Sequence, residues 1–217
     1  RTGELRTTWK GLAVGSAQVA SELGSGVPRK PRTAQAKRTP EVLQRLEAAR
    51  GRRSRPSGTS DIRRGKAMLE LFSGCGRLSG AALDLGLRVG VPFDIEDSRS
   101  LDLQDRKVQS VVRRWIRDGK LWYIHFGTPC TGFSCANTSG GGRSWHHSLA
   151  CARFTVQCIK LCERFGVCWT VENPASSALF KWAPFTRVCH ATSAAAITYD
   201  NCRFGTPWLK PTCLVGT

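Results

Sequence analysis

The sequence lacks the features that mark several classes of protein. None of its ten cysteines forms a CxxC pair, and with only four histidines no set of zinc ligands stands out. It has no secretory signal and no apolar run near the roughly 20 residues that a membrane-spanning helix needs. We therefore expect an intracellular protein without a metal, whose cysteines, all from Cys75 onward, are reduced and mostly buried.

Acidic residues are scarce: 16 Asp and Glu stand against 33 Lys and Arg, for a formal charge of +17. Such a surplus favours a polyanionic partner through phosphate contacts and counterion release. Residues 1–66 hold 16 of the basic and five of the acidic residues, so this segment carries +11 and the remainder +6. Because the segment has few large apolar residues, we predict a largely disordered basic extension with a short helix over 40–50. A nucleic-acid arm, a nuclear-import signal and a solvated linker all fit it.

From about Ala67, short apolar runs alternate with amphipathic stretches, a pattern typical of βαβ units. The pattern predicts strands over 68–72, 88–93, 121–126, 167–172, 194–199 and 211–215, and helices over 78–85, 104–118, 148–165 and 176–181. This order predicts an α/β, Rossmann-like fold over 67–217, with a mainly parallel sheet and helices on both faces. In such folds, ligands bind at the carboxyl ends of the strands.

Three motifs fall at predicted strand ends: Phe72-Ser73-Gly74-Cys75-Gly76, Gly127-Thr128-Pro129-Cys130 and Val171-Glu172-Asn173-Pro174. The glycine turn lets the backbone pass close to a ligand. A cysteine becomes a strong nucleophile when its surroundings lower its pKa, and Cys130 is the candidate. Glu172 ends the strand expected beside it, and we predict that partial burial raises the pKa of this acid.

Together, in this order, the three motifs resemble the cytosine-5 DNA methyltransferase family. The resemblance implies the S-adenosylmethionine-dependent methyltransferase fold and transfer of a methyl group to carbon 5 of cytosine. Attack by the Cys130 thiolate on carbon 6 would make carbon 5 nucleophilic, and Glu172 would protonate or hydrogen-bond ring nitrogen 3. The predicted substrate-binding residues are Pro129, Asn173, Arg203 and Lys210.

The resemblance also implies a cofactor site for S-adenosylmethionine at the glycine turn. Phe72, Gly74 and Gly76 would line it, Asp94 would bind the ribose hydroxyls, and Asp102 would bind the adenine amino group. Glu96 is an alternative to Asp94. A loop-capping role is the alternative for Asp102.

The sequence departs from the family pattern near its end. Trp208, Lys210 and Thr212 stand where the family has Gln, Arg and Arg, and Arg203 is the guanidinium left to compensate. The chain also reaches Thr217 without the family's target-recognition region. Three functions therefore stay open: cytosine-5 methylation of DNA, the same chemistry on RNA, or a catalytically inactive nucleic-acid-binding protein that keeps the fold. We expect a nuclear monomer that binds DNA or RNA through its basic segment and catalytic cleft. We do not expect it to bind a membrane.

Overall fold

The computed structural model describes residues 65–134, 143–204, 207 and 209–217. Five strands form one sheet in the order β1-β2-β3-β5-β4. Their bounds are β1 Ala67–Leu71, β2 Leu121–Phe126, β3 Cys168–Pro174, β4 Ala195–Asp200 and β5 Pro211–Gly216. β1, β2 and β3 pair in parallel, whereas β5 is antiparallel to both β3 and β4. Four of these strands therefore point the same way, and β5 fills the space between β3 and β4.

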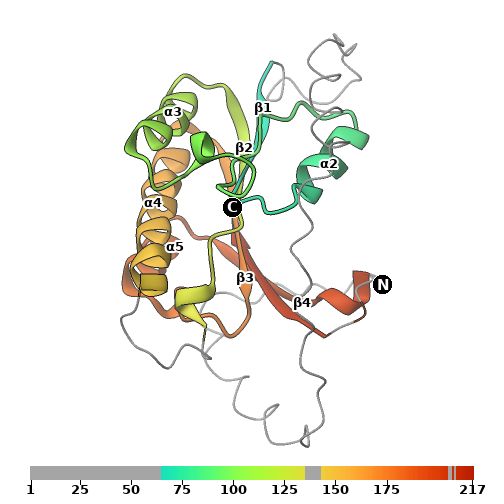
Figure 1. Ribbon diagram of the computed structural model, residues 1–217, viewed down its shortest axis with the longest axis vertical. Coiled ribbons are helices and arrows are strands. Elements are labelled where there is room, and N and C mark those ends of the chain that lie inside the picture. Colours follow the sequence, from blue (N-terminus) through green and yellow to red (C-terminus); the bar gives the residue numbers. More distant parts are fainter. Residues whose placement is uncertain (1–64, 135–142, 205–206, 208) are drawn as a thin grey trace, which may run out of the picture.

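Helices lie on both sides of the sheet (Figure 1). Three of them, α3 (Arg106–Arg117), α4 (Arg143–Phe165) and α5 (Ala183–Ala191), cover one face, and α2 (Arg77–Asp84) lies on the other beside β1. Short 3-10 turns occupy the connections: η3 Arg99–Leu101, η4 Thr131–Phe133, η5 Ala178–Lys181 and η6 Asn201–Phe204. The α/β, Rossmann-like fold class predicted from the sequence is confirmed.

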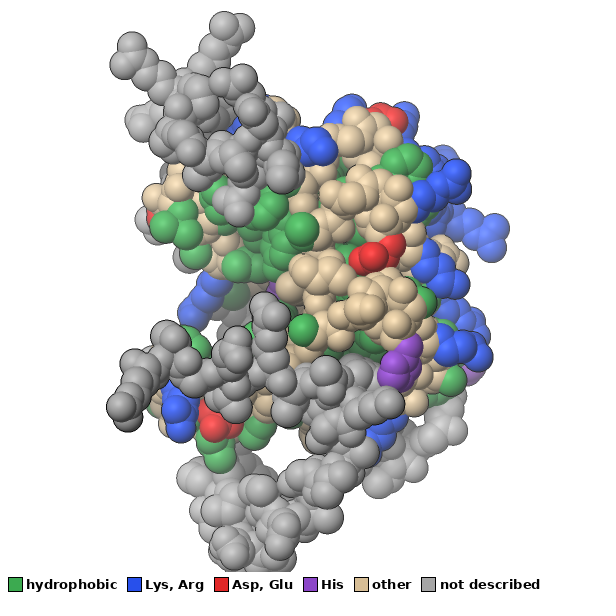
Figure 2. All heavy atoms as spheres, turned by 180° about the vertical axis from the view of Figure 1, so that it is seen from behind, with side chains coloured by type: hydrophobic (Ala, Val, Ile, Leu, Met, Phe, Trp, Pro, Cys, Tyr) green, Lys and Arg blue, Asp and Glu red, His purple; other side chains and the backbone are tan. Residues whose placement is uncertain are grey.

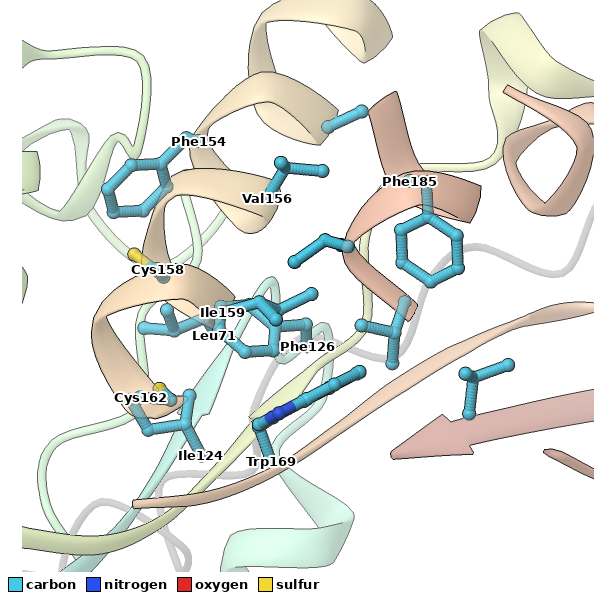
Figure 3. Close-up of a cluster of buried hydrophobic side chains, with 14 of the residues drawn as sticks. Leu71, Ile124, Phe126, Phe154, Val156, Cys158, Ile159, Cys162, Trp169 and Phe185 are labelled. Atoms are coloured by element: carbon cyan, nitrogen blue, oxygen red, sulfur yellow. The ribbon is translucent and has the colours of Figure 1, made fainter. Parts of the chain in front are cut away.

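The core lies between the sheet and α4 (Figure 3). Alternate residues of the central strands point into it, and all are fully buried: Ile124, Phe126, Trp169 and Val171. From α4, side chains at helical spacing meet them: Phe154, Cys158, Ile159 and Cys162. Trp169 keeps its one polar group satisfied, because Nε1 donates to Glu163 Oε1 at 2.6 Å.

The stretch predicted as a second strand, 88–93, runs beside β1 without forming a regular strand. At its start it exchanges two backbone hydrogen bonds with Met68, as a parallel ladder requires. The next donor in that ladder is at position 92, but Pro92 has no N–H, and Phe93 N donates to Glu70 O instead. The pairing slips by one residue there, so the prediction of a continuous strand is wrong.

The helix α5 was not predicted from the sequence. The signal was present, because a proline in the first turn is followed by apolar residues at helical spacing. These buried residues are Phe185, Val188 and Cys189. The helix predicted over 40–50 lies outside the described residues.

Within the described ranges, the structure contains no helix with the length and apolar character that a membrane crossing requires.

Candidate active site

The glycine turn after β1 contacts the acid predicted to bind ribose. Gly74 (φ 52°) and Gly76 (φ 66°) adopt left-handed backbone, which glycine tolerates, and Phe72 does so as well (φ 57°). Gly74 N donates to Asp94 Oδ2 at 2.7 Å, while Asp94 Oδ1 accepts from Glu96 N at 2.9 Å. The structure therefore brings Asp94 to the turn formed by three of the other predicted cofactor residues, Phe72, Gly74 and Gly76.

Asp102 has a different local role. Its Oδ1 accepts a hydrogen bond from Gln104 N at 2.8 Å, which is the geometry of a turn leading into α3. Burial raises the pKa of Cys151 on α4 to about 12, and the charge of Asp102 contributes to that rise. The carboxylate thus lies near α4 and makes the loop-capping contact that the sequence left as an alternative.

The ends of β1 and β2 meet closely between the first two motifs. Gly127 N donates to Leu71 O at 2.9 Å. A Cβ at Gly127 would lie 2.7 Å from Phe72 O, closer than real Cβ atoms approach other atoms, so a side chain fits here only if the backbone shifts. The Pro-Cys loop and the glycine turn therefore leave the sheet from one fixed junction.

The loop before Cys130 is held from the core side. Asn173 is buried on β3, and its Nδ2 donates to Thr128 O at 2.7 Å. The Thr128 side chain is also buried, and its Oγ1 shares a hydrogen bond of 3.0 Å with Thr155 Oγ1 of α4. Two polar contacts therefore fix the backbone two residues before Cys130.

The loop after Cys130 is anchored to α4. Gly132 N donates to Ser148 Oγ at 3.0 Å, and Phe133 N donates to Cys130 O at 2.9 Å. The Phe133 ring is buried and contacts two indole rings, those of Trp145 and Trp182. Cys130 itself stays partly exposed. The chain thus presents a partly accessible thiol on an anchored loop.

Most other described thiols are buried. Desolvation raises the pKa of Cys189 to about 12 and that of Cys158, Cys162 and Cys213 above the ordinary value. These thiols, with Cys151, therefore resist ionisation and serve as packing groups.

A row of polar side chains lies on the sheet face opposite the main core. Glu70, His125 and Thr170 are paired across β1, β2 and β3, so they point to the same side. His125 Nδ1 and Thr170 Oγ1 share a hydrogen bond of 2.9 Å, and the Tyr123 hydroxyl bonds the same oxygen. Glu172, two residues beyond Thr170, faces this side and lies 3.7 Å from His125 Nε2 through its Oε2.

The environment of Glu172 contradicts one prediction. The interaction with the His125 side chain, opposed by burial and aided by the charge of Lys210, holds the pKa of Glu172 below its ordinary value of 4.5. We predicted a raised pKa from burial alone, which is wrong because the sequence did not show that a histidine faces the carboxylate. At neutral pH Glu172 is therefore a carboxylate.

The predicted substrate-binding residues are more dispersed. Pro129 is partly exposed beside Cys130, and Lys210 lies near enough to Glu172 to lower its pKa. Asn173 points to the sheet face opposite Glu172, and besides Thr128 it bonds the backbone carbonyl of Glu172. Arg203 is exposed in η6.

His125 was not among the predicted site residues. The alternation of Leu121–Phe126 places this histidine on the side of its strand opposite Ile124 and Phe126, and the register of β2 and β3 brings it to Glu172. Among the described residues, no group of three or more His, Cys, Asp or Glu is arranged to hold a metal ion.

Comparison with known proteins finds similarity in fold and none in sequence family. No protein-family model matches the sequence, and no curated protein matches it. Among solved structures, the fold is similar to that of the methyltransferase EhMeth of Entamoeba histolytica, with a TM-score of 0.46 and 16% sequence identity. The match covers 69% of this chain and 52% of that chain, so the chain spans about half the length of that protein.

Proposed function

We propose that the chain is an S-adenosylmethionine-dependent methyltransferase that acts on carbon 5 of cytosine in DNA, with Cys130 as nucleophile. One observation carries the proposal: a partly exposed thiol stands on a loop anchored on both sides, after the strand next to the one that holds Glu172. Nucleophilic catalysis needs this combination of access and fixed position, because misplacement of the reacting atom slows the reaction steeply.

In the proposed reaction, the Cys130 sulfur forms a bond to carbon 6 of cytosine. The electron pair of the 5,6 double bond moves into the ring, which makes carbon 5 nucleophilic and able to take the methyl group. Loss of the carbon 5 proton to water then restores the double bond and breaks the carbon–sulfur bond. The chain's task is to hold the sulfur over carbon 6 and to stabilise the charge on the ring.

We propose that Glu172 acts here together with His125. An ionised Glu172 accepts a hydrogen bond from the exocyclic amino group of cytosine and so orients the base. His125 Nε2 lies 3.7 Å from Glu172 Oε2 and would help to hold the carboxylate in place against the base. The role of Glu172 as an ionised hydrogen-bond acceptor follows from its lowered pKa.

The residues at the glycine turn fit an adenosyl cofactor. A Cβ built on Gly74 meets nothing within 4 Å, so space remains above the turn, and the Asp94 carboxylate is fixed beside it. Phe72, Gly74, Gly76 and Asp94 would hold the cofactor. When bound, S-adenosylmethionine supplies an electrophilic methyl group on a sulfonium centre.

The proposal is tested with duplexes that contain 5-fluorocytosine, because fluorine at carbon 5 prevents the final elimination and leaves the protein attached to the base. With S-adenosylmethionine present, we expect a covalent adduct visible on a denaturing gel and mapped to Cys130 by mass spectrometry. Cys130→Ser should abolish it, and Cys168→Ser, which changes an exposed thiol of β3, should not. Glu172→Gln should slow it by roughly 10²–10⁴-fold.

Parallel reactions with DNA and RNA substrates distinguish the two targets. An adduct with RNA alone would move the proposal to RNA. Equal trapping of the wild type and the Cys130→Ser variant would show that the nucleophile is wrongly assigned. Calorimetry with S-adenosylmethionine checks the cofactor half separately, and the Asp94→Ala variant should bind more weakly.

A further inference from the structure

The positive charge of the described domain is concentrated on one layer of helices. Of the 17 basic residues that follow position 66, ten belong to α3, α4 and α5, and these helices contain a single acid, Glu163. The three helices thus carry +9, while the rest of residues 67–217 carries −3. In Figure 2, Lys and Arg side chains gather along the side on which α3 and α4 lie.

On α4 the charges form a stripe. Arg153, Gln157, Lys160 and Arg164 follow one another at spacings of four, three and four residues, so they share one side of the helix, and all four are exposed. Glu163 is the one acid in the α4 sequence, and its carboxylate accepts the Trp169 indole N–H. The three basic residues of the stripe and this acid together leave a net charge of +2, with the like charges of Lys160 and Arg164 one turn apart.

The α3 helix repeats the pattern with the same spacing. Its stripe consists of Arg106, Ser110, Arg113 and Arg117. Arg113 joins the two helices, because its Nη1 donates to Gln157 Oε1 of α4 at 3.2 Å and its guanidinium lies over the Phe154 ring. The two stripes therefore run side by side, and we call them the basic helical face: Arg106, Arg113, Arg117, Arg153, Lys160 and Arg164.

We infer that the basic helical face binds the phosphate backbone of a double-stranded nucleic acid. A stripe of 12 residues covers about 16 Å along the helix, at ~1.5 Å per residue. That length matches roughly five base-pair steps of ~3.4 Å, so each stripe can follow several phosphates. The six like charges of the face outnumber the single acid of these helices, so they repel one another in the free protein, and a polyanion relieves that repulsion.

The composition of the face favours a nucleic acid over an anionic membrane. A helix that binds a lipid surface inserts large apolar side chains between the headgroups. Among the described residues, the exposed large apolar side chains include one on α3, α4 or α5, namely Phe165 at the end of α4. The residues between the charges are instead Ser110, whose hydroxyl donates to Lys107 O, and Gln157, whose amide NH2 group can donate hydrogen bonds to phosphate oxygens.

The face is distinct from the candidate active site and does not depend on the proposed methyl transfer. The site lies at the carboxyl ends of β2 and β3, whereas the basic helical face is the outer side of the helices that cover the core. It is also distinct from the basic segment before residue 67. Binding by this face should therefore survive the Cys130→Ser substitution unchanged.

The test is fluorescence anisotropy of the full chain with two unrelated 20-base-pair DNA duplexes and one RNA duplex, between 50 and 200 mM salt. The variant Arg153→Gln/Lys160→Gln should reduce the slope of log affinity against log salt by about 2 on both DNA sequences, because each phosphate contact contributes ~0.9. The matched control Arg88→Gln/Arg99→Gln removes two exposed arginines outside these helices and should leave the slope unchanged.

Arg117→Gln/Arg164→Gln provides a second variant of the face with the same expected loss, and circular dichroism confirms that each variant folds. A loss on DNA, on RNA or on both supports the inference and identifies the duplex that is bound. If the helical and control variants lost the same amount of this slope, the inference would be overturned, because binding would then depend only on the net charge of the protein. It would also be overturned if the Arg153→Gln/Lys160→Gln substitutions weakened binding to phosphatidylserine vesicles and left nucleic-acid binding intact.

Discussion

The two faces of the sheet are built from alternate residues of the same strands, yet they differ in kind. On the side of α3, α4 and α5, β2 and β3 contribute Ile124, Phe126, Trp169 and Val171, all fully buried. On the other side, the same strands contribute Tyr123, His125, Thr170 and Glu172, which bond to one another. Helices cover the first of these sides, whereas on the other side α2 lies beside β1.

This difference shows where stability and chemistry are separated. Burying a polar side chain costs free energy unless hydrogen-bond partners replace the water that it loses. A row of half-buried polar side chains is therefore a place where we expect function. The core side supplies most of the hydrophobic stabilisation. Substitutions one residue apart on β3 should therefore have different consequences, and the following predictions test that separation.

The largest effect is expected for Trp169→Ala. It removes the largest fully buried side chain among the described residues, together with the hydrogen bond to Glu163, so the free energy of unfolding should fall by about 3–5 kcal/mol. Urea denaturation measures it. The adjacent Cys168→Ala variant, at an exposed position of β3, should change the value by less than about 0.5 kcal/mol. Similar losses in both would remove the distinction between the faces.

Gly127→Ala should destabilise the protein by about 1–3 kcal/mol, because the new Cβ would overlap Phe72 O. It should also weaken S-adenosylmethionine binding, since the junction positions the glycine turn. Gly80→Ala is the control: a Cβ there meets nothing within 4 Å, and within α2 the change should stabilise by roughly 0.5–1 kcal/mol. An unaltered melting temperature for Gly127→Ala would contradict the close junction.

Asn173→Ala should cost about 1 kcal/mol through loss of the bond to Thr128 O. Because that bond fixes the loop before Cys130, alkylation of Cys130 by iodoacetamide should become faster, as followed by mass spectrometry. Asn201→Ala removes a more exposed amide and should leave the Cys130 rate unchanged. If the two variants react alike, the core side does not hold the loop.

The smallest effect concerns pH. The lowered pKa of Glu172 means that its ionised form stabilises the fold above pH 4.5 and that this contribution is lost as the pH falls through the folded-state pKa. The His125→Gln variant lacks the histidine that mainly lowers the pKa of Glu172, whereas burial, which raises it, remains. The pKa of Glu172 should therefore rise, and the part of the stability that is lost in acid should become smaller. NMR titration and unfolding at pH 7 and pH 3.5 measure both.

Glu172→Gln should remove the same pH-dependent part without loss of the histidine. A Glu172 titration that is indifferent to His125 would show that the two side chains do not interact.

Much of the fold followed from local patterns. The strand over 121–126 and the helix that became α3 were predictable because their apolar residues recur at strand and helix spacing. The second strand was not, because one missing N–H at Pro92 decides the pairing, and a hydrophobic pattern does not record hydrogen-bond donors.

The candidate site was predictable in part. Motif order placed Gly74 near Asp94, and the structure joins them by a hydrogen bond. The partner of Glu172 was not predictable, because the pairing register of two strands decides that His125 and Glu172 face the same side. The anchors of the Cys130 loop, such as Ser148, come from a distant helix whose docking no local pattern specifies.

Glu172 and Asn173 are consecutive residues that point to opposite sides of β3, and Asn173 also donates a hydrogen bond to the loop before Cys130. The peptide unit between these two residues thus connects the apolar core to both proposed reacting groups. Heating should consequently abolish activity below the melting temperature. Once packing around β3 begins to fluctuate, the Cys130 sulfur and the Glu172 carboxylate lose their alignment while the secondary structure is still intact.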